Sequence, residues 1–101
     1  MKTIQVTYTV QAGFAAQNKI NIQAVMTDLQ QLHRAGLLYH ACVKEDDKTF
    51  IHTAIFQSDD DQIFLNELAS FKFFQQQLKA SGLEVPPKQE VLTLIGSSTS
   101  F

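Results

Sequence analysis

The chain has 101 residues, 45% hydrophobic and 18% charged, which is enough for one domain with a two-layer core over residues 1–101 and too few for two. Its formal net charge of -2 provides no basic field for a phosphate backbone, so nucleic acid is not an expected partner. The single cysteine, Cys42, excludes an internal disulfide and a multi-cysteine metal site, which is typical of a reducing cytoplasm.

The first half of the chain predicts a strand, a helix and a hairpin. Apolar residues alternate with Thr and Gln over residues 3–10, the pattern of a strand with one polar face. From about residue 15 to residue 35 apolar residues recur at helical spacing, and Gly36 is expected to cap that helix. Strands over 37–44 and 49–57 flank a polar tetrapeptide of hairpin length, so they are expected to be antiparallel neighbours.

The second half predicts helical turns and a last strand. Ser58 precedes three aspartates, which favours a helix start, and a second start signal at Ser70 opens a helix that ends near Gly82. Two prolines at 86 and 87 end that region, and the last strand is expected over about 89–95. The resulting order is βαββαβ, a ferredoxin-like α+β sandwich with two helices on one face of a four-stranded antiparallel sheet.

The strand over 49–57 is apolar on both faces, which has a consequence for assembly. Phe50, Ala54 and Phe56 point one way, whereas Ile51 and Ile55 point the other. Two amphipathic helices cover only one face of the sheet. The opposite face, apolar on at least three strands in this interpretation, therefore needs a partner, and we expect a homodimer packed sheet to sheet. In the same interpretation Cys42 is a buried structural thiol.

No segment resembles a targeting or membrane sequence. Residues 1–6 begin directly as an alternating strand, and no apolar run approaches the roughly 18 residues of a membrane span. We therefore expect a soluble, unprocessed cytoplasmic protein with no membrane partner.

At the level of pattern and order the whole chain resembles the dimeric α/β-barrel superfamily, in particular the antibiotic biosynthesis monooxygenase-like domains. The resemblance rests on five stretches, namely 8–18, 36–39, 49–52, 68–74 and 95–97. It implies the ferredoxin-like fold, the homodimer, and a small hydrophobic, often aromatic, ligand held between the helices and the sheet.

Activities differ within this superfamily: some members oxidise the ligand without metal or flavin, some degrade haem, and many have no known role. The haem-degrading branch uses a tryptophan, and this chain has none. Many monooxygenase-like members also carry a histidine shortly before the second helix, and residues 66–70 contain none. The resemblance thus implies no cofactor and leaves the strand residues as candidates.

His52 is the candidate catalytic residue, because a mid-strand imidazole can act as a general base or orient a ligand oxygen near neutral pH. The alternative is a buried, hydrogen-bonded structural histidine. His40, on the preceding strand, is a candidate for ligand binding, and the two histidines could lie close across the hairpin. His33 falls on a helix and no carboxylate stands at metal spacing, so no metal site is expected.

The remaining candidates for ligand binding are Tyr8 and Asn18, which bracket the first connection and offer a hydroxyl and an amide, and Phe71 and Phe74. Aromatic residues at helical spacing, with Phe64 and Phe73 among them, are also typical of plain core. Two hypotheses stay open: a cofactor-independent monooxygenase-like enzyme acting on a small hydrophobic or aromatic molecule, or a non-catalytic dimer that binds such a molecule or serves as an interaction module.

Overall fold

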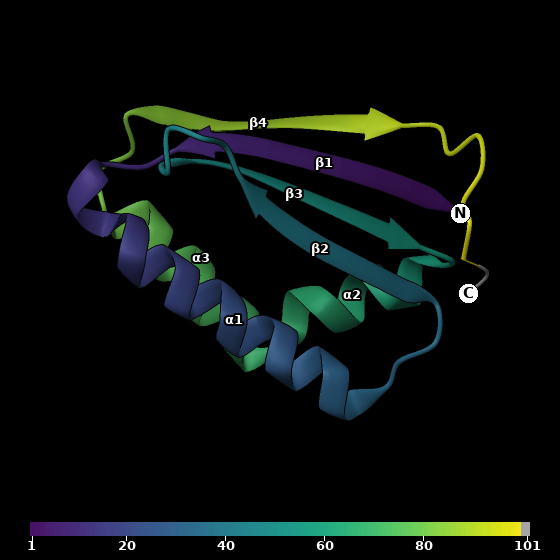
Figure 1. Ribbon diagram of the computed structural model, residues 1–101. Helices are drawn as coiled ribbons and strands as arrows, with labels where there is room; N and C mark the ends of the chain where they lie inside the picture. The colour runs from purple at the N-terminus through teal and green to yellow at the C-terminus, as the bar shows by residue number, and fades with distance from the viewer. Residues whose placement is uncertain (100–101) are drawn as a thin grey trace.

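One antiparallel sheet with strand order β2-β3-β1-β4 organises the computed structural model, which describes residues 1–99 (Figure 1). The strands are β1 (Lys2–Thr9), β2 (Leu37–Val43), β3 (Thr49–Phe56) and β4 (Val85–Leu92). A short 3-10 turn, η1 (Ala12–Phe14), precedes α1 (Ala15–Leu32), and α2 (Asp59–Glu67) and α3 (Ala69–Ala80) follow β3. The predicted ferredoxin-like order is confirmed. The second helical region is divided because Leu68 takes an extended backbone, with ψ of 126°.

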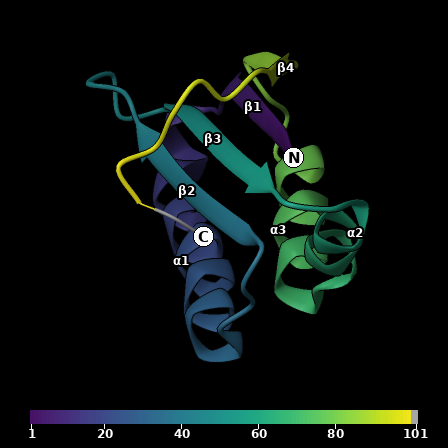
Figure 2. The same cartoon turned by 90° about the vertical axis from the view of Figure 1, so that its right-hand side faces the viewer.

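All three helices lie on one side of the sheet, with α1 beside α3 (Figures 1 and 2). The strand residues that face them are those predicted from the alternation in β1 and β3, including Ile4, Tyr8, Phe50 and Phe56, all buried. The core therefore sits between the sheet and the helices, as the two-layer expectation required.

Two left-handed residues shape the exit from α1. His33, with φ of 48°, takes the position that follows the last helical residue, and its backbone N–H donates to the carbonyl oxygen of Leu29. Gly36 was expected at that position, but it lies three residues further on, in the turn into β2, with φ of 88°. The prediction of Gly36 as the helix cap was therefore wrong, although its glycine character is needed where it is.

The predicted start of α2 at Ser58 is confirmed in detail. The Ser58 backbone N–H donates to the Asp61 carboxylate at 3.0 Å and the Ser58 side chain accepts from the Asp61 backbone, which together form a capping box, and the Ser58 hydroxyl also donates to that carboxylate at 2.9 Å. The Nε–H of Arg34 donates a hydrogen bond to the other oxygen of the Asp61 carboxylate at 2.8 Å. This pair ties the end of α1 to the start of α2.

β4 begins four residues earlier than predicted and includes both prolines. Pro86 and Pro87 fall beside an irregularity in the β1–β4 pairing, between Thr7 and Thr9, on a strand at the edge of the sheet. A proline removes a backbone donor, and edges and bulges are where a strand tolerates that loss. The expectation that these prolines precede the last strand was wrong for this reason. The segment after β4 turns across the ends of the other strands (Figure 2).

The face of the sheet away from the helices carries apolar side chains on three of its four strands, as expected. Ile51 and Ile55 do point to this side, as predicted, and Leu38 and Cys42 accompany them on β2. β1 presents only Thr and Gln there, whereas β4 presents Leu92 beside Lys88 and Glu90. Cys42 is exposed, so its expected burial does not occur within one chain. The apolar residues of this face lie on β2, β3 and the end of β4, and the polar side chains of β1 separate them.

Candidate functional site

Four buried or half-buried polar side chains form one continuous hydrogen-bonded chain between the sheet and the helices. The Asn18 amide nitrogen donates to the Tyr8 hydroxyl at 2.9 Å. That hydroxyl lies 2.7 Å from Nε2 of His52, and the Tyr39 hydroxyl lies 2.6 Å from Nδ1 of the same ring. Both nitrogens of His52 are therefore engaged by tyrosines.

Strand register explains why two tyrosines converge on one histidine. His52 is paired with Val6 of β1 and with Ala41 of β2. Tyr8 and Tyr39 each stand two residues from those partners, so all three side chains project from the same face of the sheet as diagonal neighbours. Diagonal positions are within reach of long side chains, and the hydroxyls meet the imidazole from both sides.

Asn18 reaches this group from α1. It shares the buried stripe of the helix with Ile22 and Val25, and its side chain is 0% exposed. A fully buried amide on an apolar helix face needs a partner, and the Tyr8 hydroxyl supplies one to its nitrogen. The Asn18 carbonyl oxygen has no partner among the described residues.

Phenylalanines enclose the imidazole and the tyrosine rings. The Phe74 ring lies 5.2 Å from that of His52, measured between centroids, and Phe71 meets Tyr39 edge-on at 6.1 Å. On the far side Phe50 stacks on Tyr8 at 5.6 Å. The hydrogen-bonded chain is thus set in an aromatic environment of low polarity.

A cavity of about 290 Å³ opens beside this group, between α3 and strands β1 and β4. Its walls are mostly aromatic and aliphatic, and Lys79 is the one charged side chain among them; they comprise Val6, Tyr8, Tyr39, His52, Phe71, Phe74, Gln75, Leu78, Lys79, Leu83, Pro87 and Gln89. A second space of about 130 Å³, towards α2, shares Tyr39, His52 and Phe71 with it. Together they form an apolar site with a few converging polar groups, which is typical of small-molecule binding.

Burial keeps the whole chain of polar groups uncharged near neutral pH. Removal from water lowers the pKa of His52 to about 4. The same desolvation raises the pKa of the Tyr8 and Tyr39 hydroxyls above their ordinary value, against which the hydrogen bond from Asn18 acts weakly at Tyr8. The group can therefore donate and accept hydrogen bonds at pH 7 without carrying charge.

The structure brings together most of the residues predicted from the sequence. Tyr8, Phe71 and Phe74 line the cavity with His52, and Asn18 reaches them through Tyr8. His40 does not join them, because the register places it opposite Thr53 on the other face of the sheet. The expectation that the two histidines lie close across the hairpin was therefore wrong.

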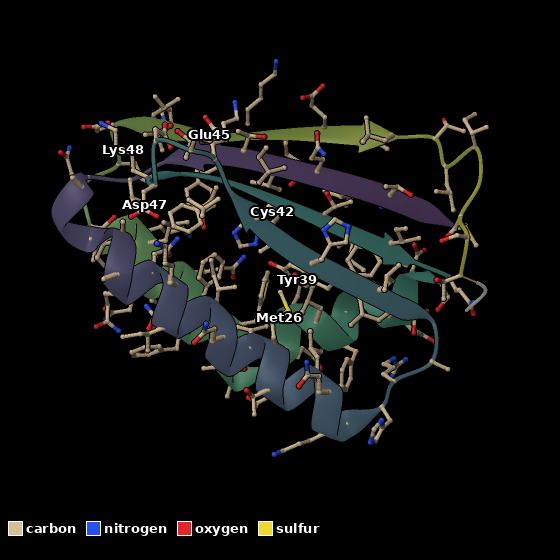
Figure 3. All side chains as sticks on the ribbon, in the orientation of Figure 1. Met26, Tyr39, Cys42, Glu45, Asp47 and Lys48 are labelled. Atoms are coloured by element: carbon tan, nitrogen blue, oxygen red, sulfur yellow. The ribbon has the colours of Figure 1, made fainter. Side chains whose placement is uncertain are left out.

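Two other aromatic candidates also lie outside the cavity walls. Phe73 is 51% exposed, and Phe64 packs under the Arg34 guanidinium, 4.6 Å from its ring centroid. Four polar or charged wall residues were missed, namely Tyr39, Gln75, Lys79 and Gln89. Tyr39 has the same strand parity as Ala41, which faces His52, and this signal was available from the hairpin alone. Figure 3 shows Tyr39 in the layer between β2 and α1, on the side of Met26.

The part of the chain that the structure describes contains no set of side chains that could bind a metal ion. No group of three or more His, Cys, Asp or Glu side chains is arranged to hold a metal ion within residues 1–99. Over the same residues no helix is long and apolar enough to cross a membrane.

No family model matches this sequence, and no curated protein matches it either. Solved structures do. An antibiotic biosynthesis monooxygenase superposes with a TM-score of 0.78 at 8% identity, covering 95% of this chain and 100% of that one. PA3566 from Pseudomonas aeruginosa gives 0.75 at 20% identity, covering 94% of each chain.

A mutant of SnoaB, a cofactor-independent oxygenase from Streptomyces nogalater, superposes with a TM-score of 0.70 at 13% identity, covering 98% of this chain and 97% of that one. At identities this low the likeness concerns the fold. The chain has the fold of the antibiotic biosynthesis monooxygenase domains, as the sequence resemblance predicted.

Proposed function

We propose that this protein binds a small, largely apolar aromatic molecule in the cavity beside α3 and oxidises it without metal or flavin. The observation that carries the proposal is the uncharged chain from Asn18 through Tyr8 and His52 to Tyr39, set in an aromatic cavity of about 290 Å³. A solved structure of the same fold is that of a cofactor-independent oxygenase, which supports the class of reaction by analogy only.

Such a reaction needs a substrate that supplies all the electrons. An activated CH₂ group and one O₂ give a carbonyl group and one water: two C–H bonds are broken, one oxygen atom enters the product, and the other leaves as water. The walls contributed by Phe71, Phe74 and Leu78 would exclude solvent from the reactive carbanion, and the Tyr39 hydroxyl would hold the substrate oxygen.

A non-catalytic binding protein is the second candidate, and one observation favours it. Both ring nitrogens of His52 are already bonded to tyrosines, so the imidazole has no free nitrogen with which to take a proton directly from a ligand. The predicted role of His52 as the general base requires that one of these hydrogen bonds open or that a tyrosine relay the proton.

Anthrone separates the two candidates, because it is a planar aromatic ketone with an activated CH₂ group. We expect the protein to accelerate its oxidation to anthraquinone over the spontaneous rate, with consumption of one O₂ for each anthrone. Gln75→Trp, at the cavity wall on exposed α3 surface, should reduce that rate at least tenfold, whereas Gln76→Trp, one residue away and exposed, should not. Product absorbance and an oxygen electrode measure both.

The outcomes distinguish the hypotheses. Binding of anthrone that Gln75→Trp weakens, without oxidation above background, would support the non-catalytic binding protein. No binding and no oxidation would contradict a ligand site for molecules of this class in the cavity.

We further propose that a second copy of the chain covers the face of the sheet away from the helices. No helix covers this face (Figure 2). The strand residues that point to it include one lysine, Lys88, and one glutamate, Glu90, whose charges cancel, so the face is compatible with a self-complementary two-fold contact. Ile51 stands on its apolar part, half buried in the single chain. Stable dimers of this type bury more than about 1,200 Å².

Ile51→Lys is therefore expected to convert a dimer into a monomer at micromolar concentration, because an unpaired ammonium would lie in the interface. Phe73→Lys, an equally drastic change at an exposed helix position away from the sheet, is the control and should leave the dimer intact. Sedimentation velocity measures the mass of each. An unaltered chain that sediments as a monomer would contradict the dimer.

A further inference from the structure

The hydrogen-bonded chain between Asn18 and Tyr39 has a direction, and the direction is set at its buried end. Asn18 presents its amide nitrogen to the Tyr8 hydroxyl and leaves its carbonyl oxygen without a partner among the described residues. A buried N–H group without an acceptor is rarer in proteins than an under-satisfied carbonyl oxygen, so this orientation is the less costly one.

The orientation of Asn18 determines what the Tyr8 hydroxyl does. Its oxygen accepts from Asn18, and the residue is 1% exposed, so its single hydrogen has one polar neighbour left, Nε2 of His52 at 2.7 Å. If Nε2 carried a hydrogen of its own, the two hydrogens would face each other or the buried hydroxyl hydrogen would have no acceptor. Tyr8 therefore donates to Nε2, which is the unprotonated nitrogen.

The tautomer of His52 then fixes the role of Tyr39. A neutral imidazole without a hydrogen on Nε2 carries it on Nδ1, and Nδ1 donates to the Tyr39 hydroxyl oxygen at 2.6 Å. The hydrogen of the Tyr39 hydroxyl has no acceptor among the described residues. Tyr39 lines both the larger cavity and the smaller space beside it, so this donor is available to a molecule bound there.

We infer that Tyr39 is the ligand-contacting residue of this site, that its hydroxyl donates a hydrogen bond to an acceptor oxygen of the bound aromatic molecule, and that His52 is a positioning residue which acts through Tyr39. This inference rests on the proposed cavity ligand and narrows it to molecules with a carbonyl or other acceptor oxygen. It reverses the role of His52, which holds a donor in place and takes no proton in the resting state.

The rest of the wall suits such a ligand. Lys79 is the single charged residue among the residues that line the larger cavity, and no carboxylate accompanies it. Gln75 and Gln89 add exposed amides at the same wall. A ring system whose oxygen carries partial or full negative charge is therefore favoured over a cation or a molecule that can only donate.

Three bicyclic probes of similar size test the inference. Indane offers no polar group, 1-indanone offers an acceptor oxygen only, and indole offers an N–H donor only. We expect 1-indanone to bind about tenfold more tightly than indane, the effect of one net hydrogen bond, and indole to gain no such advantage. Isothermal titration measures the three dissociation constants.

Tyr39→Phe removes the hydroxyl and keeps the ring that meets Phe71. It should abolish the preference for 1-indanone and leave the affinity for indane within about twofold. The matched control is His40→Gln, the next residue along β2 on the opposite face, which should keep the preference.

A second measurement needs no ligand. Nitrogen-15 NMR of the histidine rings should show the hydrogen of His52 on Nδ1, and Tyr8→Phe should weaken that assignment because it removes the donor to Nε2. A resting His52 with its hydrogen on Nε2 would overturn the inference, since Tyr39 would then donate to the ring and present only an acceptor to the cavity. So would equal affinity for indane and 1-indanone.

Failure of the wider proposal looks different. If none of the three probes binds, the cavity is not a site for small aromatic molecules and the contact inferred for Tyr39 falls with it. If all three probes bind with equal affinity, the inferred direction of the hydrogen-bonded chain is contradicted, whereas the proposal of a ligand site is still supported.

Discussion

Gly36→Ala is expected to lower the free energy of unfolding by about 2–4 kcal/mol, the largest loss expected from a glycine-to-alanine change in this chain. Two independent costs combine. The backbone at Gly36 has φ of 88°, which costs a residue with a Cβ roughly 1–2 kcal/mol. The new Cβ would also stand 2.6 Å from one carboxylate oxygen of Asp61 and 2.8 Å from the other.

Asp61 is poorly able to move out of the way. Its carboxylate accepts from the Ser58 backbone and hydroxyl and from Arg34, so displacement would open the capping box of α2 and the tie to α1. The ion pair with Arg34, with the hydrogen bonds from Ser58, also lowers the pKa of Asp61. The clash therefore propagates into two helices.

The chain provides two matched controls. Gly82 has φ of 72° and nothing within 4 Å of the point where an added methyl group would stand, so Gly82→Ala reports the backbone cost alone, about 1 kcal/mol. Gly13 has neither a positive φ nor a neighbour within 4 Å, and Gly13→Ala should change stability by less than about 0.5 kcal/mol. Urea unfolding at one fixed chain concentration measures all three. Equal losses for Gly36→Ala and Gly82→Ala would show that Asp61 yields without cost.

Local patterns predicted the elements well because each depends on neighbouring residues. The alternation in β1 and β3, the tetrapeptide of the hairpin and the start of α2 at Ser58 all correspond to the structure. The prolines of β4 could not be placed in the same way. Whether a proline can sit in a strand depends on which edge is unpaired, and that is decided by the strand order, which no local pattern contains.

For the candidate site, too, the features that depend on neighbouring residues could be predicted and those that depend on strand register could not. The place of Asn18 on the buried helix face is predictable from its helical spacing to Ile22, and the inward position of His52 from its parity with Phe50. The meeting of Tyr8 with His52 depends on the register between β1 and β3, and the two residues are 44 positions apart in sequence. The sequence therefore identified Tyr8, Asn18 and His52 singly, missed Tyr39, and could not join the four residues into a chain.

The outer face of the sheet shows the limit of reading one strand at a time. Ile51 and Ile55 face away from the helices and Leu92 of β4 does so too, but β1 presents Thr and Gln there, and β4 also presents Lys88 and Glu90. The expectation of three apolar strands holds for β2, β3 and β4, but the polar strand β1 lies between β3 and β4 and divides the apolar surface, and that order is set by topology.

His52→Phe is expected to lower the free energy of unfolding by about 2 kcal/mol at pH 7.5, because the buried Tyr8 hydroxyl loses its acceptor while the phenyl ring fills a similar volume. The size of this loss should depend strongly on pH. In the folded protein the pKa of His52 is about 4, whereas in the unfolded chain it is near the ordinary value of 6.5.

The sign follows from where the proton binds. Between about pH 6.5 and pH 4 the unfolded chain takes up a proton on His52 that the folded protein does not, so the unaltered protein loses stability as the pH falls through this window. A shift of this size costs about 2.5 kcal/mol between pH 7.5 and pH 4.5. The phenylalanine variant lacks this contribution, and its stability should approach that of the unaltered protein near pH 4.5.

Urea unfolding at a series of pH values measures the convergence. Ile51→Val, the neighbouring residue of β3 on the opposite face, is the control: it should cost about 1 kcal/mol with the same pH dependence as the unaltered protein, since it removes a methylene and no titrating group. Two curves that stay parallel for His52→Phe would mean that His52 takes up its proton as readily in the folded protein as in the unfolded chain. A buried neutral imidazole between Tyr8 and Tyr39 would then be excluded, and with it the hydrogen-bonded chain on which the proposed ligand contact depends.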